Sequence, residues 1–394
     1  MMRPLLAAAL LLASPAAAGD GLDRALGKAL FERAWVPAPS STRANDGLGP
    51  LFDARACASC HPRGAQRGMA AFDAEGRPEG FGLVLALLRA DGAPDPAYGR
   101  RLETMTLPGV PAEGEVRADR IAGRPVPRIA QPGYGALDAG TGLGLRVAPD
   151  LRGRGLLERV PDAALLALED PDDRDGDGVR GRARRLPDGT LGRFGWKAAH
   201  ARLDQQAAEA FTLDLGLSTP LAPEPWGDCT AVQAACRAAP HGREAEGEAE
   251  ISAAILDRIV AYLRDLPAPA ATPDRRGAAL FAATGCAACH RPSLPLEGSG
   301  AAALFTDALL HDMGQGLADP VGAPGVGAAE WRTAPLAGLR DALARRAGLL
   351  HDGRAADVAE AVRWHGGEAE GARLRFKALD NRSRAKLVEY VAGL

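Results

Sequence analysis

Two short segments carry the residue types best suited to hold a redox cofactor. Each has two cysteines separated by two residues and followed directly by a histidine: Cys57, Cys60 and His61 in one, and Cys286, Cys289 and His290 in the other. In a C-x-x-C-H motif the two thiols form thioethers to the haem vinyl groups, and the histidine ligates the iron. A thioredoxin-like motif needs no such histidine, and a zinc site would need further cysteines. We therefore predict two covalently bound c-type haems, with His61 and His290 as iron ligands.

The N-terminus has the pattern of an export signal. Arg3 precedes an apolar run from Leu5 to Leu12, and Ala16 to Ala18 form a small-residue cleavage site. We predict that residues 1–18 are removed near Ala18 and that the mature protein is periplasmic. A retained membrane anchor is the alternative, although the apolar run is too short to span a bilayer.

The remaining two cysteines, Cys229 and Cys236, have no histidine beside them. In an oxidising compartment a local disulfide is the simplest interpretation, and a reactive dithiol is the alternative.

The overall charge argues against two classes of partner. The chain has 47 basic and 50 acidic residues, a formal charge of −3. Because no excess of positive charge exists, we expect no nucleic-acid partner, and no later segment predicts a stable membrane insertion.

The chain also shows an internal repeat. Leu51-Phe52 and Leu280-Phe281 each precede a C-x-x-C-H motif, and the helical pattern ending near Leu266 resembles the one ending at Leu394. We predict an N-terminal haem domain over 19–266, a linker over 267–276 and a C-terminal haem domain over 277–394. The excess length of the first domain, mainly residues 91–160, is interpreted as loops with room for a small hairpin, and not as a separate domain.

Several strings resemble one known family. They are Trp35–Arg43, Arg193–Ala198, His311–Gly314 and Leu350–Arg354. With the two motifs, they resemble the bacterial di-haem oxidoreductases, described as peroxidases or thiol oxidoreductases, and more distantly the di-haem cytochrome c peroxidases. The resemblance implies a mainly α fold of two class I cytochrome c-like domains that face each other.

The resemblance also implies residues around the second haem. His351 and Arg354 match a segment that, in the peroxidases, runs on to a methionine as the sixth iron ligand. His365 stands where that methionine would be, so we predict His365 as the sixth ligand. Met313 is the rival ligand, and His311 is expected to form hydrogen bonds instead.

Around the first haem, the resemblance implies Gln206 and Asp214 on the substrate side, where an acid can relay a proton. Trp196 is either an electron relay between the haems or part of the core. Lys197 is one of only four lysines. Because a buried lysine can lose its proton whereas arginine cannot, Lys197 is either a displaceable ligand or peroxide donor at the first haem, or an ordinary surface residue.

A possible calcium loop lies between the motifs. Asp173, Asp175, Asp177 and Gly178 occupy positions 1, 3, 5 and 6 of an EF-hand-type loop. Position 12 is Arg184 instead of the usual glutamate, so the sequence leaves open a bound Ca²⁺ or an acidic turn.

Together these features predict a periplasmic enzyme that reduces hydrogen peroxide with electrons from a small cytochrome c or cupredoxin. The alternatives are a di-haem enzyme that oxidises protein side chains, as the enzyme that matures methylamine dehydrogenase does, and a cytochrome that only transfers electrons.

Overall fold

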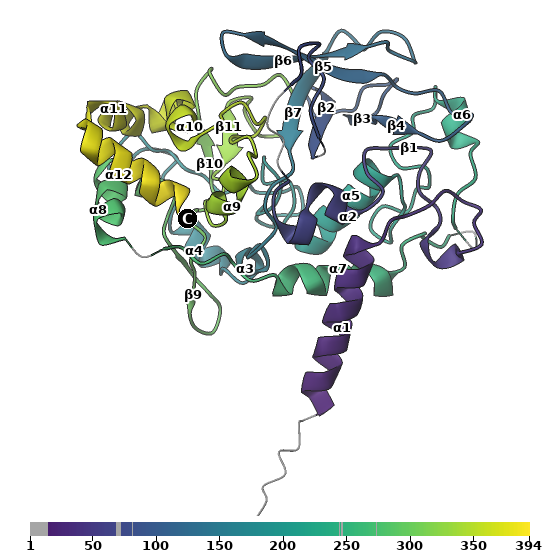
Figure 1. Ribbon diagram of the computed structural model, residues 1–394, viewed down its shortest axis with the longest axis horizontal. Helices are drawn as coiled ribbons and strands as arrows, with labels where there is room; N and C mark the ends of the chain where they lie inside the picture. Colours follow the sequence, from purple (N-terminus) through teal and green to yellow (C-terminus); the bar gives the residue numbers. More distant parts are fainter. Residues whose placement is uncertain (1–14, 68–71, 81, 244, 246, 273) are drawn as a thin grey trace, which may run out of the picture.

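The computed structural model describes residues 15–67, 72–80, 82–243, 245, 247–272 and 274–394 (Figure 1). Arg3 and the apolar run of the predicted export signal lie outside these residues. Within the described part of the chain, no helix is both long enough and apolar enough to cross a membrane.

Three helices frame the N-terminal half of the protein: α1 (Pro15–Glu32), α5 (Leu203–Leu215) and α7 (Ala253–Asp265). Helix α7 buries its apolar stripe and begins at Ser252, whose hydroxyl accepts the N–H of Ile255. It ends just before Pro267, which cannot continue a helix. Helix α5 ends at Gly216, whose φ of 68° permits the left-handed turn that stops it.

Helices α1 and α7 cross at very short range. A Cβ at Gly27 would overlap the carbonyl oxygen of Arg258 and lie 2.8 Å from Tyr262 Cβ. One turn later, Phe31 packs against Tyr262 with ring centroids 5.3 Å apart. The glycine is therefore required for the close approach of the two backbones.

The C-terminal half repeats this crossing with α8 (Arg275–Ala283) and α12 (Asn381–Ala392). A Cβ at Gly277 would lie 2.6 Å from Tyr390 Cγ, and Phe281 packs against Tyr390 with centroids 5.7 Å apart. The glycine and the phenylalanine four residues later occur in both halves, so the structure contains an internal repeat.

The repeat differs in one respect from the predicted alignment. Leu51-Phe52 is not a helical counterpart of Leu280-Phe281, because it forms strand β1, which pairs with β4 (Met105–Thr106). The structural counterpart is Leu30-Phe31 in α1. The chain between Glu32 and Cys57 separates this helix from the first C-x-x-C-H motif, whereas α8 ends directly before the second.

The expectation of a mainly α fold is wrong, because the chain is 30% helix and 16% strand. Much of the strand lies in the region interpreted as loops. Strand β7 (Thr141–Val147) of this region pairs along its length with β2 (Leu83–Arg89), which lies just before the region, and β2 also pairs with β3 (Arg101–Leu102). Strands β5 (Glu115–Ile121) and β6 (Arg124–Ala130) form the hairpin, which lies at the top of Figure 1.

This β region buries a hydrophobic cluster of its own, which explains why it forms sheets. Its buried members are Leu85, Leu87, Tyr98, Leu102, Val116, Ala118 and Leu145. The alternation of inward and outward residues along β2 places Leu85 and Leu87 on the buried face. The glycines and arginines of this β region interrupt the alternation of apolar and polar residues in the sequence, so strands β2, β3 and β7 were not predicted.

The other elements are short. In the N-terminal half they are η1 (Arg43–Asn45), α2 (Cys57–Cys60), η2 (Pro62–Gly64), α3 (Gly155–Glu158), α4 (Asp162–Leu166) and α6 (Ala234–Arg237). In the C-terminal half they are η3 (Cys286–Ala288), β8 (Leu294–Pro295), β9 (Ala301–Ala302), β10 (Leu310–Asp312), β11 (Glu330–Arg332), α9 (Leu339–Ala344), α10 (Val358–Trp364), η4 (Gly367–Ala369) and α11 (Glu370–Ala378).

The two halves share their largest hydrophobic core. Leu294, Leu304 and Leu309 of the C-terminal half belong to the same buried cluster as Leu157 and Val160 of the N-terminal half. Residues 267–272 between the halves form no helix or strand, and α8 starts inside the predicted linker, at Arg275. The predicted domain boundaries stay a prediction.

Candidate functional site

Both C-x-x-C-H motifs form one tight turn. The N–H of His61 donates to the carbonyl of Cys57 at 3.0 Å, and that of His290 donates to Cys286 at 3.0 Å. The four motif cysteines are free thiols, and none is in a disulfide. Each turn thus presents two thiols and an imidazole to one place, as thioether attachment and axial ligation of one haem require.

The thiols are poorly suited to disulfide exchange. Burial raises the pKa of Cys57 and Cys60 to about 12 and that of Cys286 to about 11. Because the thiolate is the nucleophile in exchange, such thiols react slowly at neutral pH.

His290 is oriented by a backbone contact. Its Nδ1 lies 3.1 Å from the carbonyl oxygen of Phe305, which leaves Nε2 available to a metal. Burial lowers the pKa of His290 to about 4, yet part of its surface is accessible. The imidazole of His290 is therefore surrounded by protein but borders an internal space.

That space is a cavity of about 590 Å³, which is within the usual range for cofactor pockets. Its walls include residues of both halves, among them Trp196, Cys286, Cys289, His290, His311, Met313, Trp331, His351 and His365. Apolar residues from α8, α10, α11 and α12 line a further part of it, including Phe281, Val362, Phe376 and Leu387.

His365 follows the last residue of α10 and lines the same cavity as His290. Its Nδ1 lies 2.7 Å from the carbonyl oxygen of Ala361, so its Nε2 is also available to a metal. Met313 lines the cavity as well. The structure thus brings both candidate sixth ligands to the second motif and leaves the choice between them as a prediction.

These observations show that the C-terminal site fits a covalently bound haem. It offers two free thiols, two imidazoles with available nitrogens, and an apolar cavity. At the N-terminal motif, burial lowers the pKa of His61 to about 4, although a hydrogen bond with the backbone of Pro149 acts in the opposite direction. The ring of His61 is therefore neutral, as an iron ligand must be.

His311 forms hydrogen bonds through both ring nitrogens. Nε2 lies 2.9 Å from Asp307 and Nδ1 lies 2.6 Å from Glu368. Burial alone would lower the pKa of His311, but the hydrogen bonds to Asp307, Cys289 and Glu368 raise it well above its usual value. An imidazolium held by two carboxylates is not a metal ligand.

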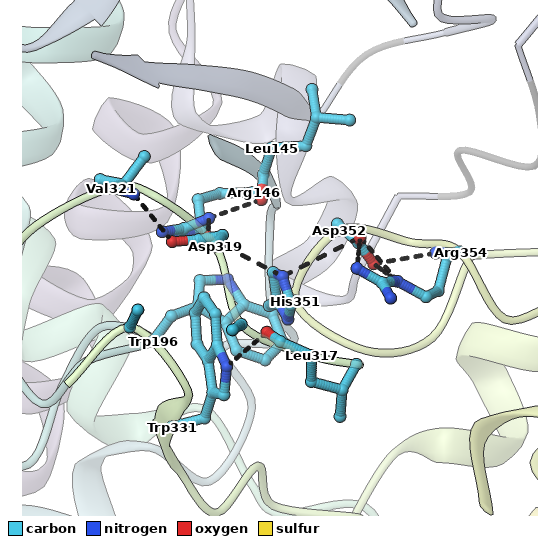
Figure 2. Close-up of polar contacts among 12 residues, drawn as sticks. Leu145, Arg146, Trp196, Leu317, Asp319, Val321, Trp331, His351, Asp352 and Arg354 are labelled. Atoms are coloured by element: carbon cyan, nitrogen blue, oxygen red, sulfur yellow. Dashed lines mark hydrogen bonds and ion pairs between the residues drawn. The ribbon is translucent and has the colours of Figure 1, made fainter. Parts of the chain in front are cut away.

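An aromatic stack lies on the cavity wall between the halves (Figure 2). The buried ring of Trp331 stacks on His351 with centroids 3.7 Å apart and an angle of 12°. Trp331 Nε1 donates to Leu317 O at 2.9 Å. Trp196 meets the His351 ring edge-on at 6.5 Å, and its own Nε1 donates to Val147 O at 3.0 Å. Sequence reasoning singled out Trp196 and His351 but missed Trp331.

Lys197 lies over the same stack. Its Nζ is 3.7 Å from the Trp331 ring centroid and donates to the carbonyls of Gly327, Ala328 and Glu330 at 3.1, 3.0 and 2.6 Å. Burial lowers the pKa of Lys197 to about 7, whereas these acceptors favour the ammonium form. The structure therefore places Lys197 against the C-terminal half, and its hypothesised action at the N-terminal haem stays a prediction.

Arg354 is held by an acid and an aromatic ring. Its guanidinium pairs with Asp352 at 2.6 Å and lies 4.6 Å from the Trp364 ring centroid. The resemblance assigns His351 and Arg354 to this segment. His351 lines the cavity, whereas Arg354 stabilises the segment through its contacts with Asp352 and Trp364.

Acidic residues surround the N-terminal motif. Asp214 and Gln206 both lie on α5, and the carbonyl of Asp214 accepts the N–H of Asp53 at 2.8 Å. Asp214 pairs with Arg101, and burial raises its pKa. The Gln206 side-chain oxygen points towards the backbone of Gly195.

Asp53 is an acid that sequence reasoning missed. Its Oδ1 accepts hydrogen bonds from the Thr104 N–H and hydroxyl at 2.9 and 2.6 Å, and its buried Oδ2 has no partner among the described residues. Burial raises its pKa to about 6. The only sequence signal was an aspartate four residues before the motif.

The other two predicted features are also placed. Ligand atoms of Asp173, Asp175 and Asp177 lie within 4.8 Å of one another, and Asp177 borders the cavity. Calcium binding stays a prediction. Cys229 and Cys236 are joined in a disulfide.

Comparisons with known proteins show a family and a similar solved structure. The family described as "Di-haem oxidoreductase, putative peroxidase" matches residues 136–394. A hydrazine synthase structure from Kuenenia stuttgartiensis, pressurised with 20 bar xenon, is 16% identical with a TM-score of 0.39, over 94% of this chain and 92% of that chain. That score is too low to support an argument. A comparison with curated proteins found no match.

Proposed function

Because the chain belongs to the di-haem oxidoreductase family, we propose that it is a periplasmic peroxidase that takes electrons from a small cytochrome c or cupredoxin and reduces hydrogen peroxide. The reaction consumes one H₂O₂, two electrons and two protons, and yields two waters. Bound haem would supply the electron storage and the iron coordination that this chemistry needs.

The observation that carries the proposal is the pair of C-x-x-C-H turns combined with different surroundings. The C-terminal motif shares its cavity with two candidate sixth ligands, His365 and Met313. The acids near the C-terminal motif, Asp307 and Glu368, are paired with His311, whereas Asp53 beside the N-terminal motif has an Oδ2 without a partner among the described residues. This difference favours an electron-accepting site in the C-terminal half and a reactive site in the N-terminal half.

The acids near the N-terminal motif suit proton transfer. Asp53 has a pKa of about 6 and a free Oδ2, so at neutral pH this oxygen can both take up and release a proton. The carboxylate of Asp214 is held by Arg101, and its backbone carbonyl accepts the N–H groups of Asp53 and Ala54, which keeps α5 against the segment that precedes the motif. The required protons would pass through Asp53 Oδ2.

Electron transfer between the halves would use the aromatic stack. Trp196 and Trp331 each contact the ring of His351, and all three side chains line the C-terminal cavity. We propose that these rings connect the two haem sites.

The test uses protein produced in a host that attaches haem, with mass spectrometry to confirm two haem additions. Electron paramagnetic resonance of the half-reduced protein should show one high-spin haem, and H₂O₂ should oxidise two molecules of a reduced small cytochrome c. Two low-spin haems in every redox state without peroxide turnover would overturn the proposal and favour an electron carrier.

The acid is tested by Asp53→Asn, with the exposed Asp188→Asn as the matched control. Asp53→Asn should lower kcat and remove the fall in kcat above about pH 6 that an acid of this pKa produces. An unchanged pH profile would exclude Asp53 as the proton donor.

A further inference from the structure

Two buried arginines on the cavity wall have no carboxylate partner among the described residues. Arg154 comes directly before α3, in the N-terminal half, and Arg332 ends β11, in the C-terminal half. Both side chains line the cavity, and each residue is only 7% exposed. Burying a guanidinium is costly unless an anion compensates its charge.

Neither arginine finds that anion within the described chain. Arg154 Nε donates to the carbonyl of Asp150 at 2.7 Å, and its buried Nη1 has no partner. Arg332 Nε donates to the carbonyl of Gly195 at 2.9 Å, and its Nη1 donates to that of Thr333 at 3.0 Å. Backbone carbonyls solvate the two charges but do not neutralise them.

The carboxylates whose charge acts on these arginines already have other partners. Asp150, which favours the charged form of Arg154, pairs with Arg152 at 2.6 Å. Asp307, which favours the charged form of Arg332, is bonded to the imidazolium of His311 at 2.9 Å. Each acid therefore has a closer cation to neutralise.

The electrostatics agree with this description. Burial lowers the pKa of Arg332 to about 9, and the positive charge of Arg154 adds to the effect. Burial also lowers the pKa of Arg154 to about 10. Two like charges that disfavour each other in a cavity wall are stabilised when a ligand brings negative charge.

We propose that Arg154 and Arg332 form a carboxylate-binding pair that takes the propionate groups of the haem attached at Cys286 and Cys289. Haem carries two carboxylates, and the same cavity holds its predicted thioether and histidine attachments. Because one arginine comes from each half, binding would also join the halves. The inference rests on haem attachment and does not require peroxide turnover.

The consequence is a haem potential that depends on these arginines. A positive charge beside the propionates stabilises the reduced haem, which carries one more negative charge than the oxidised haem. It also keeps the propionates ionised, so that the potential should change little between about pH 6 and 9. Loss of one arginine should lower the potential and make it fall as pH rises, because a propionate then titrates in this range.

The experiment is a spectroelectrochemical titration of the holoprotein across this pH range. Arg332→Gln and Arg154→Gln should each lower the potential of the C-terminal haem and introduce the pH slope, whereas Arg332→Lys should retain most of the wild-type behaviour. Arg184→Gln is the matched control, because Arg184 is also buried and bonded to carbonyls, of Lys197 and Pro324. Mass spectrometry and circular dichroism verify two haems and a native fold in each variant.

Three outcomes would overturn the proposal. Unchanged potentials in both glutamine variants would show that the arginines are not coupled to the haem. A shift confined to the N-terminal haem would assign the pair to the other site. A wild-type potential that changes with the concentration of phosphate or acetate at constant ionic strength would show that a solvent anion, and not a propionate, occupies the pair.

Discussion

At the scale of single residues, the most informative feature is which nitrogen of each histidine is already used. His290 and His365 both have Nδ1 against a backbone carbonyl, which leaves Nε2 for a metal, whereas both nitrogens of His311 are bonded to carboxylates. The histidines around the cavity therefore differ in whether a ring nitrogen is available to a metal. Their hydrogen bonds distinguish the candidate ligands from the ion-paired residue.

The first prediction concerns the sixth ligand. His365→Met should keep the C-terminal haem low-spin and raise its potential, because a thioether favours Fe(II) relative to imidazole. Redox titration followed by optical spectroscopy measures the change, with Met313→Leu as the control that should leave the potential unaltered. If only the Met313 variant shifts the potential, Met313 is the ligand.

The second prediction concerns the pH dependence of stability at Lys197. Burial lowers its pKa to about 7 in the folded protein, below its ordinary value of 10.5 in the unfolded chain. Between these values the unfolded chain binds more protons, so the free energy of unfolding should rise with pH from about 7 to about 10. In Lys197→Met this contribution is absent.

Urea unfolding of both proteins at several pH values tests this prediction. The wild-type free energy of unfolding minus that of Lys197→Met should increase with pH over this interval. A difference that stays constant would mean that the three carbonyl acceptors keep the folded-state pKa near its ordinary value.

At the scale of elements, the protein is organised by two helix crossings of the same kind. In each, a glycine lets an N-terminal helix approach a C-terminal helix, and a phenylalanine one turn later packs on a tyrosine: Gly27, Phe31 and Tyr262 in the first, and Gly277, Phe281 and Tyr390 in the second. These two crossings lie outside the C-x-x-C-H motifs. The additional residues of the N-terminal half form the β region.

The third prediction tests the first crossing. Gly27→Ala should lower the free energy of unfolding by about 1–3 kcal/mol, because its methyl group would overlap the backbone of Arg258, which cannot move aside without displacing α7. Gly21→Ala in the same helix is the control. No atom of the described residues lies within 4 Å of its added Cβ, so the better helix propensity should be neutral or stabilising by up to about 1 kcal/mol. Similar losses in both variants would refute the packing argument.

At the scale of the whole molecule, the two halves are joined by a shared core and by ion pairs, one of them nearly buried. Arg146 of β7 pairs with Asp319 at 2.5 Å, with both side chains nearly buried, and Arg182 pairs with Glu330 at 2.6 Å. The aromatic stack and Lys197 lie across the same boundary. Haem potentials in one half should therefore respond to changes in the other.

The fourth prediction is that the holoprotein unfolds in a single cooperative transition. Circular dichroism, tryptophan fluorescence and haem absorbance should give coincident curves. Asp319→Asn should lower the free energy of unfolding by about 3–5 kcal/mol, because it leaves the buried Arg146 without its partner. Asp119→Asn, which breaks the exposed pair with Arg128, should cost less than about 1 kcal/mol. Two separate transitions, or equal losses, would contradict this description.

The sequence alone determined the features that neighbouring residues encode. A C-x-x-C-H turn needs five consecutive residues, and the apolar period of α7 with Pro267 after it predicts one helix, so both could be read directly from the chain. Only the tertiary structure decided the rest. It showed that the counterpart of Leu280-Phe281 in the internal repeat is Leu30-Phe31 and not Leu51-Phe52. It also showed sheets where loops were expected. It also brought Trp331 to Lys197, and Arg154 to Arg332, from opposite halves. Such contacts depend on which segments, distant in the sequence, pack together. No local sequence pattern indicates this, because the stabilising energy comes from the assembled cavity wall and not from any one segment.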